Sequence, residues 1–549
     1  MSDQAAQNAV VRKLAKGSLL SRLTGSRRQP LRLIAVPRDH VQGDRSKGDA
    51  LVAGRFVCGT EQLALADLDF AAIGADGPLA EQLQGFSWLR DLAAAASRER
   101  GAGLVEAIVG RWLLAHGTRV DAAWRPELWG ERILFWTAYA PYILSSTDNG
   151  YRSALLNTLA RGARHLEANA DKAPAGLKRV TAWAGVVAAA LVIQGGVARV
   201  ARGESGLGRA LGSAQSDDGG LISRTPYEQV RLVDRLGLLR SAYFAAKHNP
   251  PESLEPAAAA ALSALHGVIL GDGGLSSWQG GNSEDSARLT AIIEGCGLRA
   301  RALRQPRGWG FHRLSALGTV VVMDAAPPPP PKAARSGCAS TLAFEISDGR
   351  QRIVVNCGGP APFPSDMPAD LANALRTTAA HSTVTVADTN STAILPDGSL
   401  GKGVGDVMVE RSEDNDSSRI DASHDGYARA FGLTHRRVLT LGNDGKELRG
   451  TDELAPKSRR RSKDGTPFAI RFHLAHGIEP TITADGMGAI LRSPAAPPWN
   501  FRSRGAAIGV EESLMVDGQG IPRRTMQLVI NVEAAASGAE VHWQFRRSS

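Results

Sequence analysis

The histidines in the second half of the chain are the side chains whose chemistry is easiest to infer. His381 follows the run RTTAA at 376–380 and precedes the stretch STVTV at 382–386. It therefore stands at the entrance of an expected strand, where an imidazole can point out of the sheet end into a cleft. A neutral imidazole can remove or deliver a proton near pH 7, or bind a divalent metal. We expect His381 to be a general base, with metal ligation as the alternative.

A second polar group lies further along the same half. His424 and Tyr427 flank a turn, and His435 and Arg436 follow in the next expected strand. The group adds another histidine on a strand, a phenol beside a turn and a cation, which together can bind and orient a substrate. We expect His424, Tyr427 and Arg436 to bind substrate.

The first half offers one polar loop of interest, at residues 217–227. It opens a helix at Pro226, since proline suits the first helical turn. The guanidinium of Arg224 can hold a carboxylate through two parallel hydrogen bonds, and the phenol of Tyr227 can protonate a leaving oxygen. We expect these two residues to take part in catalysis. The alternative is a surface loop with a solvated arginine.

Several common catalytic motifs are missing from the sequence. It contains no G-x-x-x-x-G-K-[ST] phosphate loop, no G-x-S-x-G elbow and no H-E-x-x-H helix. The four cysteines are scattered without a C-x-x-C pair, which argues against a zinc ribbon or a redox motif. Nucleotide hydrolysis, serine-elbow hydrolysis and zincin chemistry are therefore not expected.

The elements that position these residues change character near the middle of the chain. From Gly85 to Leu303, segments such as 152–169, 177–194 and 227–248 place apolar residues at helical spacing. After Arg307 the period becomes two, with short runs separated by Asp-Gly turns. The pattern predicts an α + β multidomain chain, with a helical toroid or bundle followed by a β-sandwich. We place a basic arm at 1–45, the helical domain at 46–305 and the sandwich at 306–549.

Length and composition fit this division. The chain has 549 residues, of which 43% are hydrophobic and 22% charged, so each domain can build a core. A disulfide-rich mini-protein and a disordered regulator are excluded. The formal charge of +9 is compatible with an acidic polymer as partner, and the basic loop at 457–463 could contact one. No recognition motif supports a nucleic acid as partner, and no apolar run is long enough for a transmembrane segment.

The N-terminal segment bears on location. Residues 1–30 are basic, but no continuous hydrophobic run or signal-peptide cleavage site follows. We expect a cytoplasmic or membrane-peripheral protein. The alternative is the periplasm, where a protein acting on exported polymer would work. Residues 10–23 form either a basic amphipathic helix at a membrane surface or a solvated arm.

The order of several segments resembles the heparinase II/III-like family of polysaccharide lyases, in particular its bacterial branch without a signal peptide. The resemblance covers most of the chain and is carried by residues 85–92 (GFSWLRDL), 218–226, 266–285, 339–358, 375–386, 423–437 and 471–474. It implies an N-terminal (α/α) toroid and a C-terminal antiparallel β-sandwich. It also implies β-elimination at a uronic acid within an acidic polysaccharide or oligosaccharide, without an organic cofactor. The sequence carries no signal for which polysaccharide is used or for the oligomeric state.

The resemblance also implies roles for single residues. His381 matches the family's histidine at the start of a sandwich strand, and Tyr227 falls near the toroid's tyrosine. Asn169 is the candidate for the amide that contacts the substrate carboxylate. The secreted lyases have an Asn-His pair there, whereas this chain has Asn169-Ala170. Two hypotheses follow. The protein is either an active lyase or a non-catalytic protein for glycan binding or envelope-polysaccharide biogenesis that retains the fold.

Some family members hold a structural divalent metal in the sandwich through two histidines and an aspartate. His435 and Asp397, with His381 as third ligand, have approximately that spacing. The resemblance therefore implies a possible zinc or calcium ion here. A metal on His381 would occupy its lone pair and exclude the base role.

Overall fold

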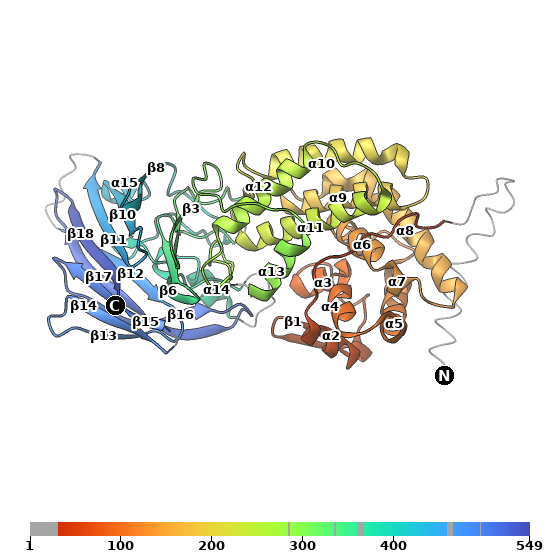
Figure 1. Ribbon diagram of the computed structural model, residues 1–549, viewed down its shortest axis with the longest axis horizontal. Helices are drawn as coiled ribbons and strands as arrows, with labels where there is room; N and C mark the ends of the chain where they lie inside the picture. The colour runs from red at the N-terminus through yellow and green to blue at the C-terminus, as the bar shows by residue number, and fades with distance from the viewer. Residues whose placement is uncertain are drawn as a thin grey trace. The chain divides into compact units, whose positions relative to one another are not determined.

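The computed structural model describes residues 31–283, 286–333, 336–360, 367–457, 465–494 and 496–548 (Figure 1). Contacts divide the chain into two compact units. The first comprises Met1–Ala214, Arg231–Ala259 and Thr290–Leu298, and the second Gln215–Val230, Ala260–Leu289 and Arg299–Ser549. The expected domain boundary near residue 305 stays a prediction, because these units interleave along the sequence. Residues 1–30 of the expected basic arm and 458–463 of the expected basic loop lie outside the described residues.

The first unit is built from helices and one small hairpin, β1 (Arg55–Cys58) with β2 (Glu61–Ala64). The helices are α2 (Arg45–Val52), α3 (Pro78–Gly85), α4 (Leu89–Ala95), α5 (Arg98–His116), α6 (Pro126–Ala138), α7 (Ala140–Ile143), α8 (Asn149–Asn169), α9 (Leu177–Val192), α10 (Val200–Ala214), α11 (Pro226–Ala246), α12 (Leu254–Gly267) and α13 (Ser286–Gly295). The last three continue into segments of the second unit. The helical periodicity of the sequence is therefore confirmed.

Tryptophans form the core of this helical unit. The indoles of Trp112 and Trp129 lie edge to face, with ring centroids 5.9 Å apart. The guanidinium of Arg132 is fully buried and lies 4.2 and 4.6 Å from these two ring centroids. Burying a cation without a carboxylate partner costs free energy. The aromatic faces offset part of this cost, and so does the Gln84 carbonyl, which accepts a hydrogen bond from Arg132 at 2.8 Å.

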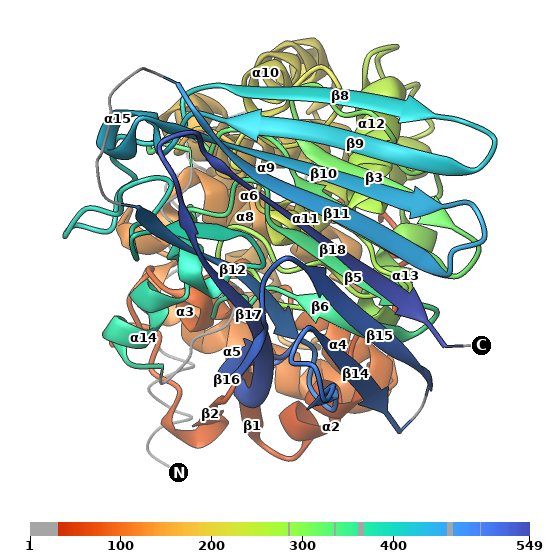
Figure 2. The same ribbon diagram turned by 90° about the vertical axis from the view of Figure 1, so that its left-hand side faces the viewer.

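The second unit is dominated by two eight-stranded antiparallel sheets (Figure 2). The first has the order β16-β17-β12-β6-β5-β4-β3, with β7 paired to β12. Its strands are β3 (Phe311–Ala316), β4 (Thr319–Asp324), β5 (Phe344–Asp348), β6 (Gln351–Val355), β7 (Val384–Val386), β12 (Thr466–Leu474), β16 (Gly509–Val516) and β17 (Pro522–Ala534). The short helix α14 (Ala369–Ala374) and a 3-10 turn at Thr378–Ala380 precede β7.

The second sheet has the order β13-β14-β15-β18-β11-β10-β9-β8. Its strands are β8 (Val407–Glu413), β9 (Ser417–His424), β10 (Leu433–Gly442), β11 (Glu447–Pro456), β13 (Glu479–Ile482), β14 (Gly488–Ser493), β15 (Ala496–Arg504) and β18 (Ala539–Arg547). Helix α15 (Ala428–Phe431) lies in the connection from β9 to β10. One hydrophobic core contains buried residues from both sheets, such as Phe344 and Phe472 from the first and Trp543 and Phe545 from the second. The expected antiparallel sandwich is therefore confirmed.

Strand β10 shows how the sandwich sorts its polar residues. Buried and partly exposed positions alternate along it, as the period of two requires. His435 and Arg437 are fully buried with Leu439, whereas Arg436 points to the opposite, solvent-facing side. The sandwich interior therefore contains a charged cluster as well as apolar side chains.

Candidate functional site

His381 occupies the turn between the 3-10 segment Thr378–Ala380 and strand β7. Its side chain is 2% exposed, and Nδ1 lies 2.7 Å from the carbonyl oxygen of Thr377. Because a carbonyl only accepts, Nδ1 carries the proton and Nε2 keeps its lone pair. Burial lowers the pKa of His381 to about 4, although the Thr377 carbonyl and the charge of Asp324 act in the opposite direction. His381 is therefore neutral at pH 7, as a general base must be.

The turn that carries His381 is held from several sides. The hydroxyl of Thr378 donates to the Ala339 carbonyl at 2.9 Å. The next carbonyls, of Ala379 and Ala380, accept from His473 Nε2 at 2.9 Å and from a backbone N–H at 3.0 Å. The N–H of Ser382 donates to Asn356 at 2.9 Å. Backbone groups on both sides of His381 are thus fixed by neighbouring elements, which pre-organises its imidazole.

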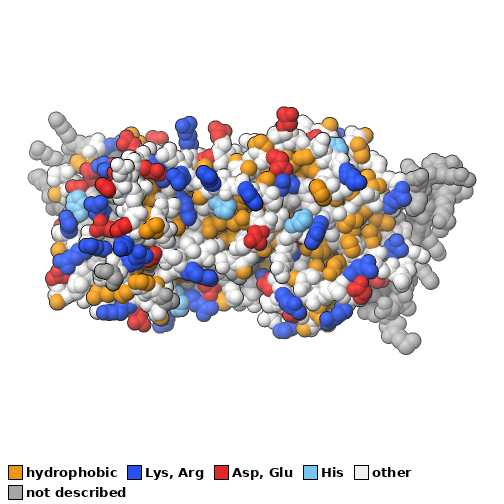
Figure 3. Space-filling model, in the orientation of Figure 1, with side chains coloured by type: hydrophobic (Ala, Val, Ile, Leu, Met, Phe, Trp, Pro, Cys, Tyr) orange, Lys and Arg blue, Asp and Glu red, His pale blue; other side chains and the backbone are white. Residues whose placement is uncertain are grey.

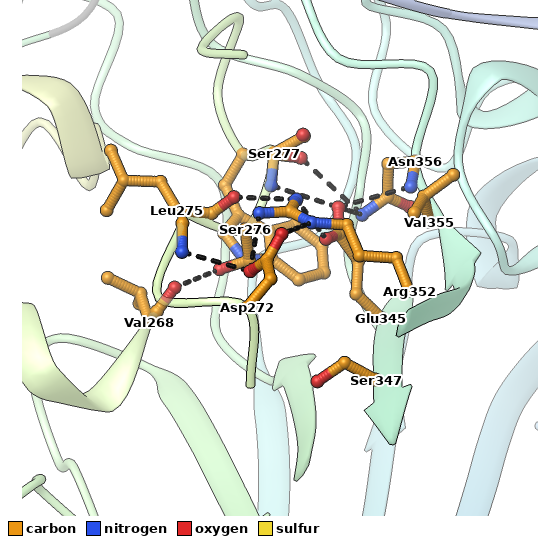
Figure 4. A network of polar contacts seen from close by, with 12 residues as sticks. Val268, Asp272, Leu275, Ser276, Ser277, Glu345, Ser347, Arg352, Val355 and Asn356 are labelled. Atoms are coloured by element: carbon orange, nitrogen blue, oxygen red, sulfur yellow. Dashed lines mark hydrogen bonds and ion pairs between the residues drawn. The ribbon is translucent and has the colours of Figure 1, made fainter. Parts of the chain in front are cut away.

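A buried network connects the loop after α12 to strands β5 and β6 (Figure 4). Glu345 Oε1 accepts from the Ser277 N–H at 2.9 Å and from the Asn356 side chain at 3.0 Å. Asp272 and Arg352 form an ion pair of 2.7 Å beside it. Burial raises the pKa of Glu345. The network thus ties residues 272–277 to the β5–β6 hairpin, and through Asn356 to the His381 turn.

Arg224 is one of the residues predicted to act in catalysis, and the structure gives it a partner within the chain. Its Nη2 lies 2.5 Å from Oδ1 of Asp324, and its side chain is almost completely buried. Its Nη1 donates to the Pro327 carbonyl at 2.7 Å and its Nε to the Trp309 carbonyl at 3.1 Å. Its backbone has a φ of 54°, a strained conformation for a residue other than glycine. The predicted grip on a substrate carboxylate stays a prediction, and it would require the pair with Asp324 to open.

Tyr227 and Asn169 come from helices. Tyr227 is half-buried in the first turn of α11. Asn169 ends α8 in the first unit, where its Nδ2 donates to the His165 carbonyl at 2.8 Å and lies 3.4 Å from His165 Nδ1. His165 lies one helical turn before Asn169, and its Nε2 donates to the Trp124 carbonyl at 2.9 Å. The i, i+4 spacing on the helix brings the two side chains together.

Three residues were expected to bind substrate, and two of them lie inside the sandwich. Tyr427 is 1% exposed and donates to the Val384 carbonyl at 2.6 Å. His424 is 3% exposed, and its Nδ1 accepts the Gly426 N–H at 3.0 Å. Both side chains are as enclosed as that of His381, and their expected role in substrate binding stays a prediction. Arg436 lies on the outer face of β10, with its Nη2 2.6 Å from Asp421.

The proposed metal ligands do not come together in the described part of the chain. His435 Nε2 lies 2.8 Å from Asp452, and its Nδ1 lies 3.3 Å from His424 Nε2, so both ring nitrogens are engaged. Asp397 is an exposed turn residue that accepts from the N–H and hydroxyl of Ser399. Among the described residues, no group of three His, Cys, Asp or Glu side chains is placed to hold a metal ion. The residues therefore do not fit the metal site that the resemblance implied.

The sequence reasoning missed Asp452. This residue is fully buried on β11 and lies opposite Arg437 of β10. It accepts two hydrogen bonds from Arg437, at 2.7 and 2.9 Å, and one from the Trp543 indole at 2.8 Å. The cation of Arg437 and the hydrogen bond from His435 hold the pKa of Asp452 well below its usual range, despite its burial. Side chains alternate between the two faces of a strand, so the spacing of four residues from the buried Leu448 would have placed Asp452 on the inner face.

Comparisons with known proteins agree with this fold. Residues 299–544 match the family described as Heparinase II/III-like, C-terminal. The structure superimposes on a crystal structure of heparinase III with a TM-score of 0.71 and 12% sequence identity, covering 99% of this chain and 90% of that one. A mutant of the heparan sulfate lyase HepC from Pedobacter heparinus gives a TM-score of 0.62 and 14% identity, covering 92% and 83%. These identities establish the fold alone.

One curated relative matches nearly the whole chain. It is the FtsZ-localized protein C of Caulobacter vibrioides, 28% identical over 536 residues, which covers 95% of this chain and 91% of the relative. No helix within the described ranges is long and apolar enough to cross a membrane.

The helices of the first unit and the sandwich of the second define a protein of the polysaccharide-lyase fold, with an N-terminal (α/α) toroid and a C-terminal antiparallel β-sandwich. Within the second unit, residues 299–544 are similar to the C-terminal domain of the heparinase II/III-like family.

Proposed function

We propose that this protein cleaves a uronic-acid-containing acidic polysaccharide by β-elimination, with His381 as the general base. The observation that carries the proposal is the state of His381. Its Nδ1–H is anchored to the Thr377 carbonyl at 2.7 Å, and burial keeps the ring neutral. Nε2 therefore holds a free electron pair at neutral pH, in a turn whose backbone is fixed on both sides. The lyase fold of the structural neighbours supports the reaction class.

The proposed reaction uses protein side chains only. The amide of Asn169 contacts the uronate carboxylate and stabilises the negative charge that develops on it. Nε2 of His381 takes the proton from C5, and the electron pair left behind forms the C4=C5 double bond. The C4–O4 bond breaks, and Tyr227 donates its phenolic proton to the leaving oxygen. The products are an unsaturated uronate and a new sugar hydroxyl.

The experiment is an absorbance assay for the C4=C5 double bond, run with heparan sulfate, chondroitin sulfate and other uronate polymers. We expect product with the unaltered chain, and a loss of about 10²- to 10⁴-fold in kcat/KM for His381→Ala. His542→Ala is the matched control, because that imidazole is 53% exposed on β18. Folded protein that yields no product on any uronate polymer would contradict the proposal.

A second candidate is a non-catalytic role in which the protein localises with FtsZ. It is favoured by the relative that spans 95% of this chain and is named an FtsZ-localized protein. It also agrees with the Arg224–Asp324 pair, which fills the predicted carboxylate grip. Of the two locations expected from the sequence, the cytoplasmic or membrane-peripheral one belongs to this second role. The periplasmic one belongs to the lyase.

Co-sedimentation with FtsZ polymers tests this second role. Binding that is equal for the unaltered chain and His381→Ala, together with glycan binding but no turnover, would support it. Glycan cleavage that disappears in His381→Ala, without FtsZ binding, would exclude it.

A further inference from the structure

The buried guanidinium of Arg437 contacts two backbone segments beside His381. Arg437 lies on β10 of the second sheet. Its Nη1 donates to the Ser382 carbonyl at 2.7 Å and to the Leu342 carbonyl at 2.8 Å. Both acceptors are in the segments that lead into strands of the other sheet, β7 and β5. One side chain thus spans the sandwich interior and holds two points of the opposite layer.

Each of the two carbonyls belongs to a residue that is linked to the candidate site. Ser382 directly follows His381, so its carbonyl fixes the exit of the His381 turn. Leu342 has a φ of 64°, and its N–H donates to the carbonyl of Asp324 at 2.7 Å. Asp324 pairs with Arg224 and acts electrostatically on His381. Arg437 therefore restrains both the candidate base and the carboxylate that influences it.

Asp452 fixes the orientation of the Arg437 guanidinium. It accepts from Nε and Nη2 in the bidentate arrangement that holds a guanidinium in one plane. The indole of Trp543 donates to the same carboxylate, and its ring stacks on Phe344 with centroids 5.5 Å apart. His435 donates to it as well, at 2.8 Å. With Nε and Nη2 held in this way, Nη1 is directed at the two carbonyls.

Stability alone is a weak explanation for this arrangement. Replacing a buried ion pair by apolar side chains of similar volume is often neutral or stabilising, because desolvation offsets the attraction between the charges. Apolar side chains would not, however, hold the carbonyls of Leu342 and Ser382. The feature specific to the ion pair is therefore its grip on the backbone around His381.

We propose that Arg437, oriented by Asp452, is a positioning residue that keeps the His381 imidazole in its Nδ1–H form. The catalytic part of this inference rests on the proposed lyase function, whereas the effect on His381 itself does not. Without Arg437, the Ser382 carbonyl loses its hydrogen bond, and the turn at 377–382 is held at this residue only by the Ser382 N–H and hydroxyl. The bond from Nδ1 to the Thr377 carbonyl then becomes intermittent, and the proton redistributes between the two ring nitrogens.

The test compares the full-length protein with the double variant Arg437→Met/Asp452→Leu, which removes both charges together. The first measurement is the tautomer of His381, read from ¹⁵N-histidine NMR and assigned with His381→Gln. The second is the change in kcat and KM. The matched control is Arg547→Met/Asp348→Leu, an ion pair of 3.0 Å at the far end of β5 from Leu342.

We expect the double variant to lose the dominance of the Nδ1–H form and about 10²-fold in kcat, with little change in KM. The control pair should leave both unchanged. Arg437→Lys, whose ammonium lacks the bidentate fork, should give an intermediate tautomer ratio. Should the double variant fail to fold, Asp452→Asn keeps the volume and weakens the same orientation.

An unchanged His381 tautomer in a folded variant would overturn the inference. A changed tautomer in a protein that shows no lyase activity before or after substitution would support the positioning role and contradict the proposed function. The experiment therefore distinguishes failure of the positioning role from failure of the proposed lyase function.

Discussion

At the scale of the residue, protonation of one imidazole controls the proposed chemistry. His381 has a pKa of about 4 because burial penalises its charged form. A base works only when deprotonated, so this group is competent from pH 7 down to about pH 4. An unperturbed histidine, with a pKa of about 6.5, would already be half protonated at pH 6.5.

The first prediction concerns the pH profile of the lyase reaction. We expect kcat/KM to stay constant on lowering the pH from 7 to 5, and to fall only as the pH approaches 4. The measurement is the absorbance assay on a substrate whose uronate remains ionised, within the range where circular dichroism shows folded protein. An acid limb centred near pH 6.5 would contradict the state of His381 described above.

At the scale of the element, Asp218 fixes the start of the sandwich domain to the polar loop at 217–227. Its carboxylate accepts the backbone N–H groups of Arg307, Gly308 and Trp309 at 2.7, 3.0 and 3.1 Å. These hydrogen bonds, with that of Ser216, lower the pKa of Asp218 despite burial. One carboxylate thus holds the segment leading into β3.

The second prediction is that Asp218→Ala lowers the free energy of unfolding by about 1–3 kcal/mol, because three backbone donors lose their acceptor. Urea denaturation measures it. The neighbouring Asp217 is exposed, so Asp217→Ala should change stability by less than about 0.5 kcal/mol. Equal effects of the two substitutions would contradict this account of the loop.

The third prediction tests the packing of β11 against β18. A Cβ built on Gly450 would lie 2.1 Å from the Trp543 ring, whose indole is held by Asp452 and Phe344. Because the ring cannot move freely, we expect Gly450→Ala to destabilise the protein by about 1–3 kcal/mol. Gly509→Ala on β16 is the control, since its Cβ would approach one carbonyl oxygen at 3.8 Å. Thermal unfolding of both variants measures the difference.

At the scale of the whole molecule, buried neutral histidines link stability to pH. Burial lowers the pKa of His312 to about 4 and that of His473 to about 3, in addition to that of His381. In the unfolded chain each has a pKa of about 6.5. Between pH 6.5 and 4 the unfolded state therefore binds protons that the folded state does not.

The fourth prediction follows from this difference. Stability contributed by the three neutral histidines is complete above pH 6.5, and falls below it by about 1.4 kcal/mol per pH unit for each. Urea denaturation at pH 7.5, 6.0 and 5.0 measures the slope. His473→Gln should reduce the slope by about one proton. A stability independent of pH over this range would contradict the prediction.

At the same scale, the net charge of the molecule does not identify a binding surface for an acidic polymer. Figure 3 shows basic and acidic side chains interspersed on the face it displays. The formal charge of +9 is therefore not gathered into one patch on that face. Recognition of an acidic polymer would depend on particular side chains rather than on overall charge.

The sequence predicted the architecture because hydrophobic period is a local property. The expected helix at 152–169 is α8 (Asn149–Asn169), and the change to a period of two marks the sandwich. The expected strand at 382–386 begins at Val384 instead, since Ser382 uses its N–H and carbonyl to bond Asn356 and Arg437. The period of two was also present in β10, where it separates the outward Arg436 from the inward Arg437.

By itself, the sequence determined two things about this protein: the order of a helical and a β-rich part, and a histidine at a strand entrance. Only the tertiary structure decided the partners of that histidine and the enclosure of His424 and Tyr427. The physical reason is separation along the chain. Arg437 and the Leu342 carbonyl are 95 residues apart, and Arg224 and Asp324 are 100 apart. Such contacts depend on how whole sheets and loops pack, which local propensity does not specify.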